Sequence, residues 1–319
     1  MASAIEMEEV EPGVFQAKKS REIPNGYWIA GSIALVGAIG YGFYRWSKRS
    51  AAGEAASLGG GDSGTAGGEG MGGAGASSEP GSGGDTSAWT NARPLPTAAD
   101  VPGFDLTKNW GKTPTDLRPL FAMMERVSGI DGAGRIFAVI AKRESGFNPA
   151  AQNDSKEERD ASRRAYANAK DRNPTLKYGA QAAEFGSGGL FAGLAPYFLW
   201  TGVPEVGGKA PLLSSPPEIM LLPRVSAWFG CVYLQRLIDN YRLDDHIDIK
   251  VGWASPSLLK SGRGNATYKA VRTRFTSDAA ELGVDLDDTS TIPAKLSAKR
   301  WPGALKVFSE IVGELPTRR

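Results

Sequence analysis

The sequence predicts a mainly α-helical domain that follows a single membrane-spanning helix and a flexible linker. Three observations support this prediction. Apolar residues recur at helical spacing after residue 105, the segment Tyr27–Tyr44 carries no charge, and glycine and serine dominate much of the stretch between them. We therefore divide the 319 residues into a short polar head (1–26), a transmembrane helix (27–46), a disordered linker (47–104) and a folded domain (105–319).

The uncharged segment is long enough to cross a membrane. Its 18 residues would extend about 27 Å as a helix, and aromatic residues lie at both ends. Five glutamates precede it and Arg45, Lys48 and Arg49 follow it, which is the wrong charge order for a cleaved signal peptide. We expect a retained anchor in membrane lipid. Small residues at every fourth position from Ala30 to Gly42 would allow two anchors to associate.

The linker lacks the apolar residues that a folded segment needs. Fourteen of the 41 glycines lie between residues 51 and 87, and a proline-rich stretch follows. Such a chain gains too little from burial to offset its conformational entropy. We expect a flexible tether with a typical reach of roughly 40 Å.

Composition narrows the chemistry of the folded domain. It carries 30 lysines and arginines against 24 aspartates and glutamates, a surplus that suits an anionic wall polymer. The basic residues form no block, so we expect no nucleic acid partner. The single cysteine, Cys231, lies on an apolar helix face, and the single histidine, His246, cannot form a multi-histidine metal site. We expect no metal and no other cofactor.

Apolar stripes place the main helices. We expect helices around residues 120–127, 136–144, 228–241, 265–275 and 302–312, and a polar helix or lid in the charged segment 155–173. Pro302 should lie in the first turn of the last of these helices.

Glu144 is the candidate catalytic residue. Ile136, Ile140 and Glu144 are four residues apart, so the carboxylate continues an apolar stripe, and Gly146 and Pro149 end the helix just beyond it. Glu144 should therefore stand at the rim of a cleft. A carboxyl group held against apolar side chains is harder to ionise and can act as a general acid.

Four motifs, in order over about 140 residues, resemble those of the soluble lytic transglycosylases. The segment Glu144-Ser-Gly-Phe-Asn-Pro149 resembles the Glu-Ser-x-x-Asn-Pro hallmark of that family, and Gly186–Pro196 resembles its glycine-rich loop. Val225–Tyr241 is similar to the helix that carries Gly-x-x-Tyr-Leu. Val251–Pro256 stands where the family has Ala-Tyr-Asn-Ala-Gly, and Tyr268 follows where a tyrosine opens the last helix.

This resemblance implies a lysozyme-like helical fold that cleaves the β-1,4 bond between N-acetylmuramic acid and N-acetylglucosamine in peptidoglycan. In that family one glutamate donates a proton to the leaving oxygen and then accepts the proton of the C6 hydroxyl, which closes a 1,6-anhydro ring. Glu144 would be the sole general acid and base, with Ser145 bracing it. Leu190, Phe191 and Trp253 would line the glycan cleft, Tyr268 would hydrogen-bond near the carboxyl, and Asn153 would contact substrate.

The chain departs from the family pattern in several places. The interval between Glu144 and the glycine-rich loop is long, and the Met-Gln of that loop is replaced by Phe191-Ala192. Trp253 replaces the tyrosine expected near the carboxyl; it can stack on a sugar but has no phenolic proton to donate. A second carboxylate would favour a hydrolytic mechanism. Five acidic residues could supply it: Asp154, Glu157, Glu158, Glu184 and Glu218.

Two alternatives to a lytic transglycosylase stay open. One is a muramidase that uses water, and the other is a glycan-binding or structural membrane protein without catalytic activity. Since peptidoglycan lies outside the inner membrane, we expect a single-pass membrane protein with its domain on the peptidoglycan side. The setting would be a bacterial envelope, or a phage virion that opens the wall locally to deliver its genome.

Overall fold

The computed structural model describes residues 7–11, 14–17, 88–172, 176–200, 212–241, 243, 245–286 and 301–319. Within these ranges the protein is mainly α-helical, as the sequence predicts. The helices are α2 (Arg118–Ser128), α3 (Ala133–Ser145), α4 (Lys156–Arg172), α5 (Gly179–Phe185), α6 (Ala195–Trp200), α7 (Pro223–Asn240), α8 (Ile247–Ala254), α9 (Pro256–Ser261), α10 (Ala266–Leu282) and α11 (Ala304–Ile311), with 3₁₀ turns η1 (Ala98–Asp100) and η2 (Pro217–Leu221).

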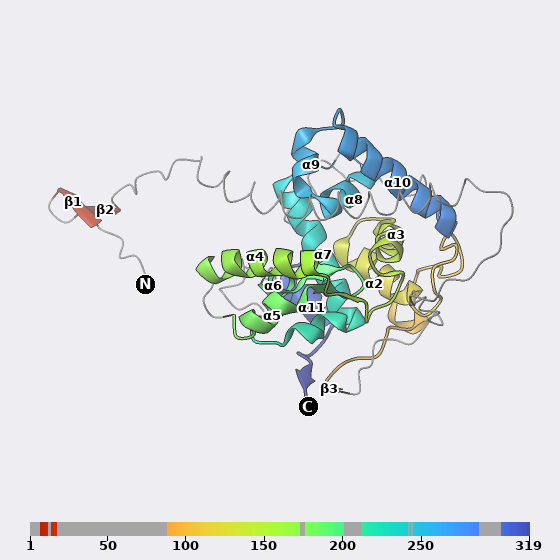
Figure 1. Cartoon of the computed structure of the whole chain (residues 1–319), viewed down its shortest axis with the longest axis horizontal. Helices are drawn as coiled ribbons and strands as arrows, with labels where there is room; N and C mark the ends of the chain where they lie inside the picture. Colours follow the sequence, from red (N-terminus) through yellow and green to blue (C-terminus); the bar gives the residue numbers. More distant parts are fainter. Residues whose placement is uncertain are drawn as a thin grey trace, which may run out of the picture.

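The core forms where α2, α3, α7 and α11 meet, near the middle of Figure 1. The apolar stripes predicted for these helices are buried. Trp228 of α7 is fully buried, donates a hydrogen bond to the carbonyl of Ala304 over 3.0 Å, and packs edge-on against Phe308. The last helix begins at Ala304, two residues after the predicted start at Pro302, because Gly303 with a φ of 91° caps it.

A second group of elements follows the end of α3. The predicted polar helix is present as α4, which packs on α5 and α6. Arg163 of α4 holds Glu184 of α5 through two hydrogen bonds of 2.7 and 2.6 Å. Beside these helices lies a three-stranded antiparallel sheet of β4 (Gln152–Asn153), β5 (Ser187–Gly188) and β6 (Gly193–Leu194).

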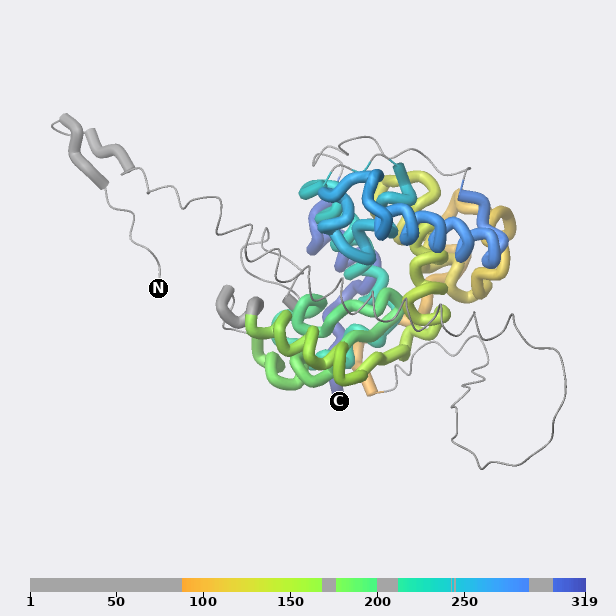
Figure 2. Tube along the Cα trace, turned by 45° about the horizontal axis from the view of Figure 1, so that its top comes forward, coloured from red at the N-terminus to blue at the C-terminus, as the bar shows by residue number. Residues whose placement is uncertain are grey.

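Helices α8, α9 and α10 lie together at the top of Figure 1, and Figure 2 keeps them apart from α4 to α6. Helix α10 packs on both α8 and α9 and also reaches α3. Its first turn is capped by Asn265, whose side chain accepts hydrogen bonds from the amides of Thr267 and Tyr268. Helix α8 is therefore placed between α10, α7 and the end of α3.

The folded chain begins before the expected boundary at residue 105. Strand β3 (Trp89–Thr90) pairs with β7 (Thr317–Arg318), and Trp89 and Val101 are buried in the core. Buried Arg224 of α7 donates hydrogen bonds to the carbonyl oxygens of Pro94 and Ile311. Residues 88–104, which composition assigns to the linker, are therefore packed on the domain, because their few apolar side chains join its core and β3 pairs with the C-terminal strand β7.

The membrane prediction cannot be compared with the described residues. The predicted transmembrane helix (27–46) and linker residues 47–87 lie outside them, as does most of the polar head. Two short strands of the head, β1 (Met7–Glu11) and β2 (Val14–Ala17), pair antiparallel. Among the helices of the described ranges, none combines the length and the apolar character that a membrane span requires.

Candidate active site

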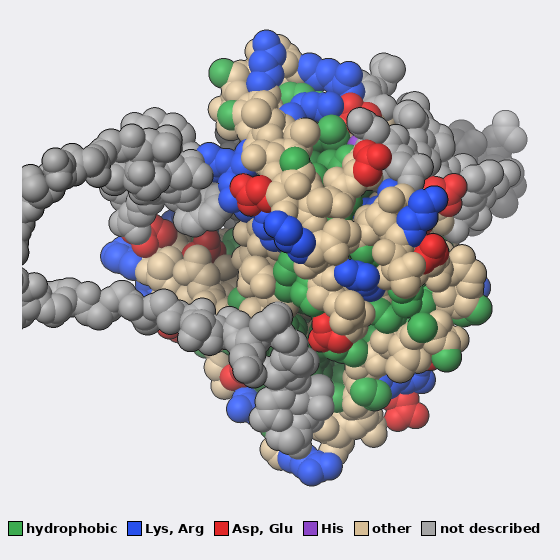
Figure 3. All heavy atoms as spheres, turned by 90° about the vertical axis from the view of Figure 1, so that its right-hand side faces the viewer, with side chains coloured by type: hydrophobic (Ala, Val, Ile, Leu, Met, Phe, Trp, Pro, Cys, Tyr) green, Lys and Arg blue, Asp and Glu red, His purple; other side chains and the backbone are tan. Residues whose placement is uncertain are grey.

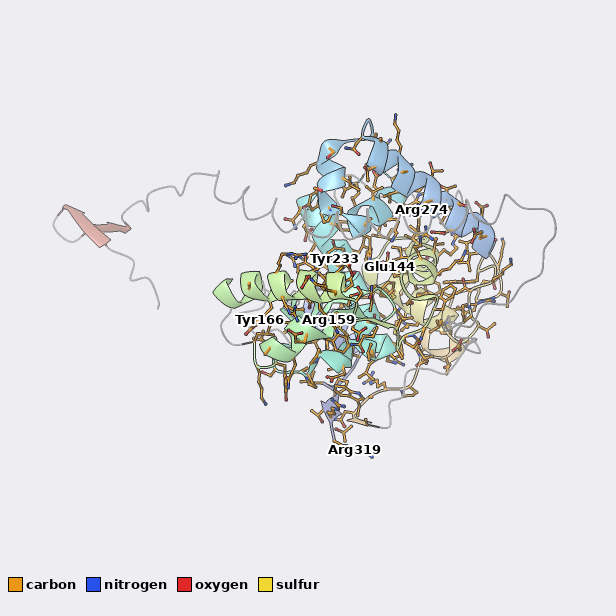
Figure 4. All side chains as sticks on the ribbon, in the orientation of Figure 1. Glu144, Arg159, Tyr166, Tyr233, Arg274 and Arg319 are labelled. Carbon is orange, nitrogen blue, oxygen red and sulfur yellow. The ribbon has the colours of Figure 1, made fainter. Side chains whose placement is uncertain are left out.

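Glu144 lies in the last turn of α3, as the sequence predicts. Ile140 and Ile136, one and two turns earlier, are fully buried, whereas the Glu144 side chain is 21% exposed. Gly146 ends the helix with a φ of 62°. The apolar stripe therefore leads from the core to a partly exposed carboxyl group, which Figure 4 shows between α4 and the α8–α10 helices.

The nearest charged neighbour of Glu144 is an ammonium group. Lys250 of α8 donates a hydrogen bond to Glu144 Oε1, and its side chain is only 3% exposed. The sequence argument placed apolar side chains around this carboxyl. The structure instead pairs it with a buried cation.

A buried cluster fixes the position of α8 and hence of Lys250. Asp248, two residues earlier, is 2% exposed and accepts a hydrogen bond from Arg272 Nη1 over 2.9 Å. Tyr268 of α10 also donates a hydrogen bond to Asp248. Arg272 Nη1 also donates a hydrogen bond to Asp245 over 2.9 Å. Burial lowers the pKa of Arg272, but the carboxylates of Asp245 and Asp248 outweigh this effect and raise it. Asp248 therefore ties α8 to α10 while Lys250 faces α3.

Glu158 of α4 is a second carboxyl group near Glu144. It is partly buried, and burial raises its pKa above the usual value, while a hydrogen bond from Ser187 acts in the opposite direction. The negative charges of Glu144 and Glu157 raise this pKa further. Helix α4 therefore brings an acidic side chain toward Glu144.

Tyr233 of α7 lies on another side of the carboxyl (Figure 4). It is 8% exposed, and its hydroxyl group is 3.5 Å from the carbonyl oxygen of Gly252. Burial raises its pKa well above the usual value, and the charge of Glu144 contributes in the same direction. The phenol therefore stays neutral beside the carboxyl group.

Three predicted cleft residues form the packed base of this region. Leu190 and Phe191 are 0% and 2% exposed, and Trp253 is 9% exposed. The Trp253 ring contacts Phe191 at 5.5 Å and Tyr233 at 4.8 Å between centroids, and Phe137 at 6.3 Å. The side chains of Leu190 and Phe191 are thus core residues, because each is enclosed on all sides, and they do not line an open groove.

The other predicted substrate residues are spread over the region. Ser145 donates a hydrogen bond to the carbonyl of Ala141 over 3.0 Å, within its own helix, and has no contact that braces Glu144. Asn153 is exposed on β4 and lies opposite Ser187 of β5. Tyr268 is 2% exposed and binds the Asp248 carboxylate rather than Glu144.

The glycine-rich loop is shaped by close backbone approaches. Gly189 has a φ of 78°, and a Cβ atom there would lie 2.4 Å from the carbonyl oxygen of Met220. The Gly189 amide donates a hydrogen bond to the carbonyl of Ala151 over 2.9 Å. The loop is thus fitted against the chain that follows Glu144.

In the part of the chain that the structure describes, no three His, Cys, Asp or Glu side chains are grouped so that they could hold a metal ion. No known family model matches this sequence, and no curated protein or solved structure is significantly similar to it.

Sequence reasoning missed Lys250 and Tyr233 and left Glu158 among five carboxylates. A signal for Lys250 was present, because Asp248 and Lys250 are the only charged residues in the apolar segment Ile247–Ala254. Two charges in a run that must be buried indicate that both have partners. Tyr233 belongs to the Gly-x-x-Tyr-Leu motif, and that match was a signal too.

Proposed function

We propose that the folded domain is a peptidoglycan lytic transglycosylase whose reaction takes place at Glu144. The observation that carries this proposal is the position of Glu144: a partly exposed carboxyl at the end of a buried helix, held by Lys250 from α8 and flanked by Glu158 and Tyr233. A carboxyl group set among buried ionisable groups is typical of a catalytic position. The four motifs that resemble the soluble lytic transglycosylases support the same reaction and a lysozyme-like fold.

The reaction needs one proton donated and one removed. The oxygen that leaves with N-acetylglucosamine must be protonated, and the C6 hydroxyl of N-acetylmuramic acid must lose its proton as it closes the anhydro ring. The substrate's own N-acetyl carbonyl would stabilise the sugar cation in between. The Lys250 ammonium places a positive charge beside the Glu144 carboxyl, the group that would remove the C6 proton.

The other residues would act from beneath the glycan or beside it. Trp253, with Phe191 and Leu190 behind it, would support the Glu144 region from the core instead of stacking on sugar rings. Tyr268 would act at a distance, by holding Asp248 and so α8. Asn153 is exposed next to the end of α3 and is the best placed of the predicted residues to touch the glycan strand.

We also propose that residues 27–46 anchor the chain in a membrane and that the linker lets the domain reach the peptidoglycan. On the face shown in Figure 3, lysine and arginine side chains are interspersed with aspartate and glutamate. A mixed surface of this kind with a small positive surplus suits a long anionic glycan strand in a bacterial envelope or at the site of phage entry.

The test is product analysis with the full chain in mild detergent. Purified sacculi are digested with wild type and with Glu144→Gln, and the soluble fragments are weighed by mass spectrometry. We expect 1,6-anhydromuropeptides from wild type and none from the variant. Fragments heavier by one water would show a muramidase, the alternative that the nearby Glu158 favours. Binding of sacculi with no soluble product would show a glycan-binding protein and refute the proposal.

A further inference from the structure

Among the five candidate second carboxylates, only Glu158 has the surroundings of a catalytic group. The other four are exposed or already held by arginine. Arg159 lies 3.9 Å from Asp154, Arg163 binds Glu184, Arg318 lies 3.2 Å from Glu218, and Glu157 is exposed. Glu158 is partly buried, and neither lysine nor arginine is among the described groups that perturb it.

The position of Glu158 is built by the sheet and the start of α4. The Glu158 amide donates a hydrogen bond to the hydroxyl of Ser155 over 3.3 Å, which fixes the first turn of the helix. The Glu158 carboxyl accepts a hydrogen bond from Ser187, a buried residue of β5. Because α4 packs on β5 and β6, this carboxyl has a defined place beside the sheet that follows Glu144.

The charges around Glu158 favour its protonated form. Of the elements packed against α4, β5, β6 and α6 carry no charged residue, and the single charge of α5, Glu184, is bound by Arg163. The remaining charges that act on Glu158 are the carboxylates Glu144 and Glu157. Glu144, by contrast, is bound by Lys250. Two neighbouring carboxyls with such different surroundings are suited to opposite roles, one acid and one base.

We infer that Glu158 is the proton donor of the reaction and that Glu144, which is bound by Lys250, is the base. This inference rests on the proposed cleavage of the glycan at this site. Glu158 transfers its proton to the glycosidic oxygen as the bond from C1 to that oxygen breaks. Glu144 takes the proton of the C6 hydroxyl as the C6 oxygen bonds to C1. No water is consumed, and a proton exchanged through solvent from Glu144 to Glu158 restores the starting state.

The test compares the pH dependence of variants in the full chain in detergent. Initial rates of anhydromuropeptide release from saturating sacculi are measured for wild type, Glu158→Gln, Glu158→Asp and Glu157→Gln between pH 4 and 9. We expect Glu158→Gln to lower the rate about 100-fold or more, as for loss of a general acid. It should also remove the fall in rate at high pH. Glu158→Asp should keep that fall and part of the rate, and Glu157→Gln should remain near wild type.

The outcomes separate this inference from the proposed function. If wild type and every variant release nothing, cleavage itself is refuted. If Glu144→Gln is inactive while Glu158→Gln keeps the wild-type rate and pH profile, the enzyme stands and the role of Glu158 is refuted. A slower Glu158→Gln with an unchanged pH profile also overturns the inference, because it would show a positioning role only. Circular dichroism and the melting temperature of each variant confirm that it is folded.

Discussion

Removing the charge of Glu144 should cost more stability than removing the charge of Lys250. The Lys250 side chain is 3% exposed and that of Glu144 is 21% exposed, so the stranded ammonium is the less hydrated of the two. Breaking a buried ion pair from one side costs about 3–5 kcal/mol. For Glu144→Gln we expect about 3 kcal/mol, the low end, because Asp278 lies near enough to act on Lys250. For Lys250→Met we expect about 1–2 kcal/mol, since Glu144 keeps some contact with water.

The double variant provides the decisive comparison. With both charges removed, the loss should be smaller than the sum of the single losses by about 1–3 kcal/mol. Melting temperatures at neutral pH report these differences at roughly 2–4 °C per kcal/mol for a domain of this size. Glu281→Gln is the matched control, because Glu281 pairs at 2.7 Å with Lys142 of α3, the helix that carries Glu144, but is 66% exposed. It should cost much less stability than either change at the buried pair. Additive losses, or a larger loss from Lys250→Met, would refute this reasoning.

Three other changes test the fold and its electrostatics. Arg224→Met should cost about 2–4 kcal/mol in urea unfolding because the buried carbonyl of Ile311 and the partly buried carbonyl of Pro94 lose a charged donor, whereas Arg126→Met, which removes one exposed hydrogen bond, should cost under about 1 kcal/mol. Gly189→Ala should lower the melting temperature well below that of Gly262→Ala, since both have a φ near 78° but only the first meets backbone, and equal losses would contradict this. Because burial raises the pKa of Glu158, its charged form weakens the folded state as the pH rises. The melting temperature of Glu158→Gln minus that of wild type should therefore increase between pH 4 and 7. A difference that decreases over this range would contradict a raised pKa of Glu158 in the folded state.

The sequence predicts the helices whose apolar stripes are long. The apolar stripes of α2, α3 and α10 identify those helices because each presents an apolar face for burial, and the longer apolar run of α7 identifies a helix that is buried on nearly all sides. The polarity of α4 is also readable, since its charged residues face water along most of its length. Sequence reasoning missed the three-stranded sheet, because its two-residue strands, rich in glycine and serine, have no alternating pattern that could indicate a strand.

The candidate site was predictable only where it follows from local periodicity. Glu144 is found because a helix repeats every 3.6 residues, so its own sequence places the carboxyl at the end of an apolar face. Leu190 and Phe191 were assigned to a cleft because a motif match gives the order of residues but not their exposure. Their burial depends on α3, α7 and α8, which lie far away in the sequence. The Lys250 contact spans 106 residues and follows from no local pattern.

The departures from the family pattern are connected through the charge of Glu144. A glutamate among apolar neighbours could hold its own proton and serve as both acid and base, but Glu144 lies against the ammonium of Lys250. A single-residue mechanism would first have to separate this pair, because the Lys250 ammonium occupies a carboxyl oxygen of Glu144. The long interval after Glu144 contains α4, and α4 supplies Glu158, a carboxyl that burial favours in its protonated form. In the mechanism that we infer, Lys250 binds the carboxyl of Glu144 and α4 supplies a second carboxyl, so the two proton transfers are divided between two residues.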